Sequence, residues 1–160
     1  MMELFERKIL ERIGREILKS KQTIAVAESV TSGLIQFAFS TIPDAAAFFQ
    51  GGVTAYNVAQ KFLHLNVEPI HATAVNCVSQ RVADEMAEEV CDRFRSDWGL
   101  GITGYATPVP ESGHKLFAYH SIYFRGKRLS IGKFIPGKME PKEAQVYYVN
   151  TIMRKLHSHF

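Results

Sequence analysis

The segment Ile24–Leu34, IAVAESVTSGL, changes character halfway along its length. Its first residues are small and apolar, as in a buried strand, whereas Glu28 opens a polar stretch that contains three hydroxyl side chains. An amphipathic helical pattern starts directly afterwards. Ligands of open α/β sheets bind beyond the carboxyl ends of strands, near the N-termini of helices. The polar stretch is therefore either an ordinary helix cap or a place where the protein carries out chemistry.

Helical and strand-like patterns alternate along the rest of the chain. Helical periodicity covers residues 3–19, 34–39, 57–65, 78–94 and the segment from Pro141 onward, and apolar strand-like runs cover residues 23–27, 48–56 and 98–103. Two consecutive strand-like runs, 116–124 and 129–135, predict an antiparallel hairpin. This order predicts one domain over residues 1–160, a three-layer α/β/α sandwich with a mixed, mostly parallel sheet.

Composition and charge exclude several classes of protein. The net charge of +3 is mildly basic, and the densest basic run, residues 125–128, reads as a solvated hairpin turn centred on Gly126. Nucleic acid is therefore not an expected partner. The first residues are charged and amphipathic, unlike a signal peptide, and no apolar run approaches the ~18 residues that a membrane-spanning helix requires. We expect a cytoplasmic protein that does not bind membranes.

The potential metal ligands are few and scattered. Cys77 and Cys91 are the two cysteines, and both lie in apolar helical surroundings without Cys-x-x-Cys spacing, so we expect free buried thiols. The six histidines show no ligand spacing on a common element. We therefore expect neither a metal nor an organic cofactor.

The stretch Glu28–Gly33 is the first of three candidate site segments. Its hydroxyl groups lie where free helix N–H groups can hold an anion or a developing oxyanion. The alternative is that Thr31 or Ser32 only caps the helix. The stretch does not match the Gly-x-Ser-x-Gly nucleophile elbow, because Ala27 and Thr31 occupy the glycine positions.

Two further segments place polar groups after strand-like runs. Residues 51–56, GGVTAY, contain adjacent glycines, which indicate a bulge or a close approach to the backbone. Lys61 lies in the first turn of the next helix, where the helix dipole disfavours the ammonium form, as a general base requires. Alternatively, its side chain extends into solvent. Thr103 ends a third strand-like run and either binds a ligand or closes a turn.

Together these segments resemble a known family. The runs AESVTSGL (27–34), GGVTAYNVAQKFLHLNV (51–67), VSQRVADEMAEEV (78–90) and GITG (101–104) occur in the order and spacing typical of the CinA C-terminal domain family. The similarity extends from Phe5 to Gly104. It implies the fold of that family, whose members include the nicotinamide mononucleotide deamidases. These enzymes hydrolyse the carboxamide of the nucleotide to the acid and ammonia.

The resemblance also implies roles for single residues. Ser29 matches the catalytic serine, Lys61 the lysine paired with it, and Tyr56 a further active-site position. A serine hydroxyl becomes a good nucleophile when an adjacent base removes its proton, and a partly desolvated lysine can be that base. Backbone N–H groups around the start of the helix would hold an oxyanion or a phosphate. The expected substrate-binding residues are Thr31, Gly33, Gly52 and Thr103.

The chain departs from the family at several positions. Val30 and Ser32 stand where the family usually has Cys and Gly. Members tend to carry Gly-Asp-Arg and a further Arg before the last helix, whereas residues 137–143 here read GKMEPKE. Such arginines would hold a substrate phosphate or carboxylate, and Lys138 or Lys142 is a partial replacement at most.

Two functions follow from this comparison. The first is an amidohydrolase of the nicotinamide mononucleotide deamidase type, acting through a Ser-Lys pair on a nucleotide or another amide. The second is a catalytically silent homologue that keeps the pocket for nucleotide sensing or for partner binding. In both cases the expected partner is a small-molecule nucleotide or amide. We also expect a homo-oligomer, with a dimer as the first expectation.

Overall fold

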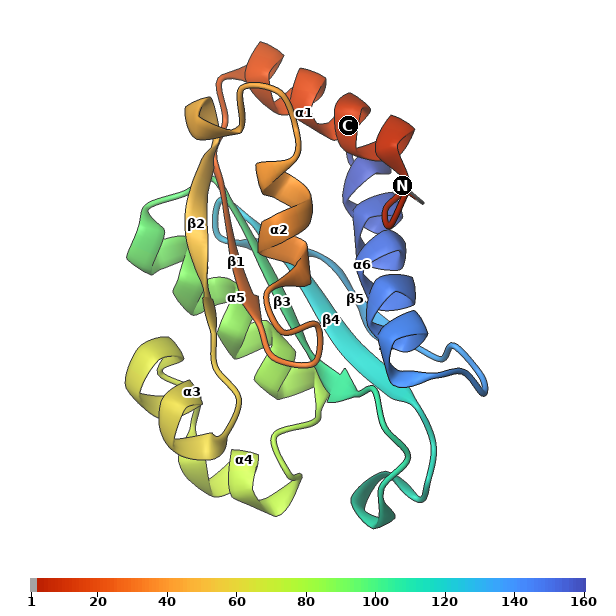
Figure 1. The fold of residues 1–160 in the computed structure, drawn as a ribbon. Coiled ribbons are helices and arrows are strands. Elements are labelled where there is room, and N and C mark those ends of the chain that lie inside the picture. The colour runs from red at the N-terminus through yellow and green to blue at the C-terminus, as the bar shows by residue number, and fades with distance from the viewer. Residues whose placement is uncertain (1–2) are drawn as a thin grey trace.

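A five-stranded sheet forms the centre of the computed structural model, which describes residues 3–160 (Figure 1). Its strands, in spatial order, are β2 (Phe49–Thr54), β1 (Ile24–Glu28), β3 (Trp98–Tyr105), β4 (Phe117–Phe124) and β5 (Lys127–Phe134). The strands β2, β1 and β3 are parallel, and the hairpin of β4 and β5 continues the sheet in antiparallel pairing. The α/β class and the mixed sheet predicted from the order of elements are confirmed.

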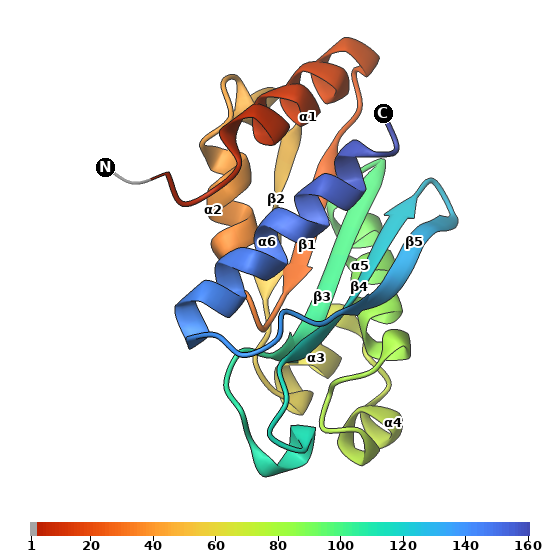
Figure 2. The ribbon, with the colours of Figure 1, turned by 90° about the vertical axis from the view of Figure 1, so that its right-hand side faces the viewer.

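Helices cover both faces of this sheet. One face carries α1 (Arg7–Ser20), α2 (Leu34–Ser40) and α6 (Pro141–His157), and the other carries α5 (Gln80–Phe94) with α3 (Val58–Leu65) and α4 (Pro69–Ala74) near one end (Figures 1 and 2). Every residue of β1 is buried, and the side chains of residues 24–27 alternate between the two hydrophobic clusters. Because both faces of the strand are covered, these four residues are all apolar rather than alternately polar.

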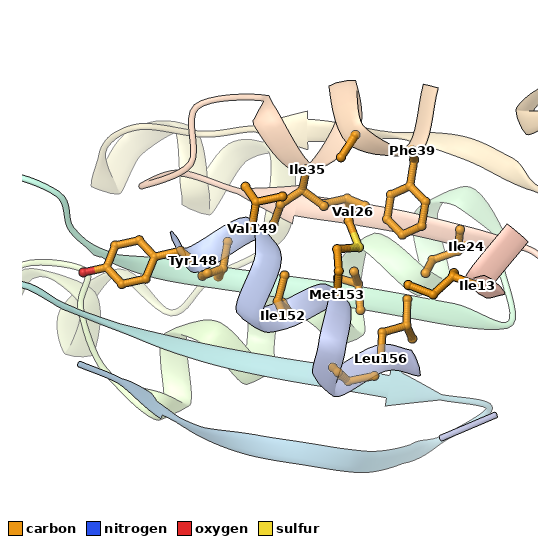
Figure 3. Packing of buried hydrophobic residues seen from close by; sticks show 14 of the residues in the cluster. Ile13, Ile24, Val26, Ile35, Phe39, Tyr148, Val149, Ile152, Met153 and Leu156 are labelled. Carbon is orange, nitrogen blue, oxygen red and sulfur yellow. The ribbon is translucent and has the colours of Figure 1, made fainter. Parts of the chain in front are cut away.

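The larger cluster depends on α6. Its buried residues lie on one helical stripe, because their spacing of three and four residues matches the helical period. Figure 3 shows this stripe packed against residues of α1, β1 and α2. The stripe consists of Ala144, Tyr148, Val149, Ile152, Met153 and Leu156. Full burial of each of the larger side chains contributes about 1.5–3 kcal/mol, so α6 is firmly held on the sheet.

Two local features differ from the sequence-based predictions. The helix α4 was not predicted; it begins at Pro69 because Glu68 accepts hydrogen bonds from the N–H groups of Ile70 (3.0 Å) and His71 (2.7 Å). The hairpin turn is tighter than predicted, since Arg125 and Gly126 both have positive φ and β5 starts at residue 127.

Of the helices within residues 3–160, none combines the length and the apolar composition that crossing a bilayer requires. Cys77 and Cys91 are both buried and free, which confirms the prediction of free buried thiols.

Candidate active site

A cavity of about 470 Å³ opens at the edge of the sheet where β1 and β3 end. This volume is typical of a site for a small molecule. Four of the predicted site residues line it, from three different segments: Ser29, Tyr56, Lys61 and Thr103. The carboxyl ends of parallel strands meet at one edge of a sheet, so residues that are far apart in sequence come together here.

A chain of hydrogen bonds orients the hydroxyl of Ser29. The residue is 6% exposed, and its Oγ donates to the Oγ1 of Thr103 over 3.4 Å. The Thr103 hydroxyl in turn donates to the carbonyl oxygen of Cys77 over 2.7 Å. Because Thr103 uses its single hydroxyl proton on Cys77, it can only accept from Ser29. The serine oxygen is thereby held in the cavity wall with a lone pair free.

The side chain of Lys61 is buried, with 2% of its surface exposed. It therefore does not extend into solvent, which was one of the two interpretations of the sequence. Its Nζ donates to the carbonyl oxygen of Ala55 over 2.9 Å. Burial lowers the pKa of Lys61, and the neighbouring Cys77 raises it to a smaller extent. The neutral amine is thus favoured compared with a lysine in water.

Ser29 and Lys61 make no direct hydrogen bond to each other within the described part of the chain. Each polar group is held by its own acceptor, Thr103 for the serine and Ala55 for the lysine. Both side chains nevertheless line the same cavity, and catalytic hydrogen bonds are often long before a substrate is bound.

The other predicted binding residues lie away from the cavity lining. Thr31 is fully buried, and its hydroxyl donates to the carboxylate of Glu28. Gly33 is the N-cap residue of α2, with a φ of +94°. Gly52 packs against its own sheet: a Cβ there would lie 2.4 Å from the carbonyl oxygen of Val26. The close approach indicated by the glycine pair is therefore made by a neighbouring strand of the protein.

The carboxylate of Glu28, the last residue of β1, lies at the N-terminus of α2. Its carboxylate, which is fully buried, accepts hydrogen bonds from the N–H groups of Ile35 (3.2 Å) and Gln36 (3.0 Å) and from the Thr31 hydroxyl. A carboxylate is stabilised at the positive end of the helix dipole, and it satisfies N–H groups that a substrate anion would otherwise bind. The apolar strand thus ends in a carboxylate because that carboxylate caps the next helix.

Sequence reasoning did not identify several residues of the cavity wall. Asn76 donates from its Nδ2 to the Tyr105 hydroxyl over 3.1 Å, and both line the cavity together with Cys77 and Glu111. Asn76 and Cys77 have φ angles of 51° and 62°, so the chain turns sharply before α5. Asn adopts the left-handed backbone conformation readily, so it is a recognisable turn signal in a sequence. Only the fold shows that this turn faces the cavity.

The helix α6 fixes two segments of the cavity wall from the opposite face of the sheet. The Nε2 of Gln145 donates to the carbonyl oxygen of Val30 over 2.9 Å, next to Ser29. One helical turn further, the Tyr148 hydroxyl donates to the carbonyl oxygen of Tyr105 over 2.7 Å. These two bonds connect the loop after β1 and the last residue of β3 to a single rigid element.

Residues 137–143, the segment in which the family carries arginines, lie outside the cavity wall. Met139 packs against the larger hydrophobic cluster, and Lys138 and Lys142 are exposed and do not line the cavity. Over residues 3–160 there is also no group of three or more His, Cys, Asp or Glu side chains that could hold a metal ion.

Comparison with known sequences identifies one family. Residues 6–120 match the family model of the CinA C-terminal domain. A putative competence-damage inducible protein of Halothermothrix orenii is 41% identical over 103 residues, which are 64% of this chain and 25% of that protein. A CinA-like protein of Chlorobium limicola is 36% identical over 118 residues, or 74% of this chain and 28% of that protein. The chain thus spans about a quarter of the length of these curated relatives.

Comparison with solved structures shows the same architecture. The competence damage-inducible protein A of Klebsiella pneumoniae superposes with a TM-score of 0.90 at 20% identity, over 96% of each chain. The competence/damage inducible protein CihA of Agrobacterium tumefaciens superposes with a TM-score of 0.88 at 25% identity, over 98% of each chain. At this level of identity, the likeness establishes the fold.

Proposed function

We propose that this chain, which belongs to the CinA C-terminal domain family, is an amidohydrolase of the nicotinamide mononucleotide deamidase type that hydrolyses a carboxamide to the acid and ammonia. One observation carries the proposal: a buried serine hydroxyl and a buried lysine line a single cavity at the carboxyl edge of the sheet. A nucleophile and a base within one partly desolvated cavity are the elements that acyl transfer needs.

Lys61 serves as the general base in this proposal. Because burial lowers its pKa, a larger fraction of the side chain is neutral amine than in water. The amine keeps one N–H on the carbonyl oxygen of Ala55, and its lone pair is then available to accept a proton. As substrate binds, the Ser29 hydroxyl leaves Thr103 and donates to this lone pair.

The reaction proceeds in two balanced halves. The Oγ of Ser29 attacks the carboxamide carbon, and its proton passes to the Nζ of Lys61. The tetrahedral intermediate then expels the amide nitrogen, which takes that proton from Lys61 and departs as ammonia, leaving an acyl ester on Ser29. A water molecule attacks the ester while giving one proton to Lys61. When the ester breaks, the same proton returns to Ser29 and the acid is released.

Neighbouring groups stabilise the charge that develops. The backbone N–H of Val30 follows the nucleophile directly and has no hydrogen-bond acceptor among residues 3–160, so it can donate to the oxyanion. Thr103 holds the serine before attack. Tyr56 is 67% exposed at the cavity, where its ring can cover a bound substrate.

Ammonia release tests this proposal. Wild type, Ser29→Ala and Lys61→Met are incubated with a panel of amides and nicotinamide nucleotides, and Ser32→Ala is the matched control, because Ser32 is exposed and does not line the cavity. We expect turnover by wild type and by the control, and its loss in the two cavity variants. Equal turnover by Ser29→Ala and wild type would exclude the serine as nucleophile.

A second candidate function is a catalytically silent homologue that binds a nucleotide or an amide as a sensor. It is favoured by the separate hydrogen bonds of Ser29 and Lys61 and by the position of residues 137–143 outside the cavity wall. Calorimetric titration distinguishes the two. Ligand binding without ammonia release from any member of the panel supports the sensor, whereas ammonia release that depends on Ser29 supports the enzyme.

A further inference from the structure

The cavity wall contains few ionisable groups. Of the residues that line it in the described part of the chain, Lys61 is the one lysine or arginine and Glu111 is the one acidic residue. Glu111 belongs to the short 3₁₀ turn Pro110–Ser112 and is exposed. The charges around a ligand in this cavity are therefore one buried base and one solvent-accessible carboxylate.

The proposed reaction uses the base at the carboxamide and not at a phosphate. Lys61 is buried and is already held by the carbonyl oxygen of Ala55. In the proposed reaction its amine faces the carboxamide rather than the distal part of the substrate. Burial also lowers the pKa of Lys61, so the charged form is less favoured than in a surface lysine.

The usual backbone site for an anion is also occupied. In the first turn of α2, the N–H groups of Ile35 and Gln36 donate to the carboxylate of Glu28, and that of Leu34 donates to the carbonyl oxygen of Thr31. A phosphate approaching this helix would compete with a buried carboxylate that is part of the same structure. The N-terminus of α2 therefore repels a second anion instead of binding it.

The ammonium group of Lys133 on β5 lies over aromatic rings of β4. The Nζ of Lys133 lies 4.0 Å from the ring centroid of Phe117, and it does not line the cavity. Phe117 in turn meets Tyr105 edge to face, with ring centroids 5.3 Å apart. One aromatic side chain thus separates this ammonium from the Tyr105 ring that lines the wall.

The rest of the wall suits an aromatic ring without negative charge. Tyr56 and Tyr105 line the cavity, and Tyr105 is held by Asn76 and by Phe117. Tyrosine faces attract cations, and their rings stack with flat heterocycles. A pyridinium carboxamide, whose ring is positively charged, matches both the tyrosines and the carboxylate of Glu111.

We propose that the cavity selects its substrate by charge: it takes a neutral or cationic ring carboxamide that lacks a phosphate, and Glu111 is the residue that sets this preference. The carboxamide part and the role given to Lys61 rest on the proposed function, whereas the preference against phosphate also rests on the exposed carboxylate of Glu111 and on the occupied N–H groups of α2. A phosphorylated nucleotide would bring its negative charge toward Glu111, and apart from Lys61 no lysine or arginine lines the described cavity wall.

Binding to the Ser29→Ala variant tests the preference without interference from turnover. The probes are nicotinamide riboside and nicotinamide mononucleotide, which differ by one phosphate group, and calorimetric titration gives the two dissociation constants. We expect the riboside to bind more tightly, and the difference to shrink as salt is raised, because salt screens exposed charges. Equal or tighter binding of the nucleotide, or binding of neither probe, would overturn the proposal.

Substitution at Glu111 tests its role. The quantity compared is the dissociation constant of the nucleotide divided by that of the riboside. We expect Glu111→Gln to reduce this ratio roughly two- to fivefold, the range of a single exposed charge contact, and Glu111→Lys to reduce it further. Glu16→Lys is the control, since it changes the net charge equally but lies on α1, at the opposite end of the sheet from the Pro110–Ser112 turn (Figure 1). An unchanged ratio in Glu111→Lys, or an equal change in the control, would refute the assignment to Glu111.

Ammonia measurements on wild type separate the two proposals. If Ser29→Ala binds the riboside preferentially but wild type releases no ammonia from any amide of the panel, the proposed hydrolase activity fails while the selection by charge stands. If wild type releases ammonia but hydrolyses the nucleotide more efficiently than the riboside, the hydrolase stands and the selection by charge fails.

Discussion

Replacing Glu28 by Gln should destabilise the protein strongly, although the two side chains have nearly the same shape. The carboxylate accepts from the N–H groups of Ile35 and Gln36 and from the Thr31 hydroxyl. A glutamine offers one oxygen, and its amide nitrogen would face a donor that it cannot satisfy. The substitution also removes the negative charge from the N-terminus of α2.

The structure sets the size of this effect. Hydrogen bonds to a charged group contribute about 1.5–3 kcal/mol each, and a buried donor left without an acceptor costs about 1–3 kcal/mol. The Oε2 atom of Glu28 accepts two of the three bonds, from Thr31 and Ile35, so a glutamine with its oxygen at that position retains these two in neutral form and leaves the N–H of Gln36 without its acceptor. The losses are not additive. We therefore expect the free energy of unfolding to fall by about 2–4 kcal/mol, a large part of the stability of a domain of this size.

Urea unfolding followed by far-ultraviolet circular dichroism measures this loss. The matched control is Glu16→Gln on α1, since the Glu16 carboxylate makes no hydrogen bond within residues 3–160. We expect the control to unfold like wild type. If Glu28→Gln lies within about 0.5 kcal/mol of wild type, the range of an ordinary surface substitution, the carboxylate does not hold α2 and our account of the strand end is wrong.

Three further outcomes are expected. Burial lowers the pKa of Lys61 below 10.5, so just below that pH the unfolded chain binds more protons than the folded chain. The free energy of unfolding of wild type should therefore rise with pH in this window. Urea midpoints measure this rise, and Lys61→Met should lack it. Burial lowers the pKa of His120 from 6.5 to about 4, so stability should fall by up to about 3 kcal/mol as the pH drops through that interval, and His120→Gln should lose this dependence in the same assay. Tyr148→Phe should cost about 1 kcal/mol and accelerate amide hydrogen exchange around Tyr105, whereas Tyr147→Phe, which removes a hydroxyl without a described partner, should change neither.

Features that depend on neighbouring residues could be predicted from the sequence. The pair Asn57 and Gln60 predicts a helix start, and in the structure the Asn57 side chain accepts from the N–H of Gln60 over 3.0 Å. The stripe of Val82, Met86 and Val90 predicts α5, and all three residues are buried. Local periodicity determined these elements because the burial of each face follows directly from the spacing of its apolar residues.

Features that depend on tertiary contacts could not be predicted in the same way. The carboxylate of Glu28 caps α2 by accepting from the N–H groups of residues seven and eight positions later in the chain. An ordinary N-cap side chain accepts from an N–H group two or three positions later. Glu111 reaches the cavity because a long loop brings it back to the end of β3. Neither position carries a spacing signal, since only the folded chain brings the partners together.

The attachment of α6 to the cavity wall has a consequence for the order of folding. The bond from Gln145 to Val30 spans 115 positions of the chain, and the bond from Tyr148 to Tyr105 spans 43. During synthesis the N-terminal part of a chain emerges first, and contacts between distant positions form late because closing long loops is entropically unfavourable. The residues that line the cavity are therefore made well before the helix that holds them in place. The cavity acquires its final shape only when the last helix docks.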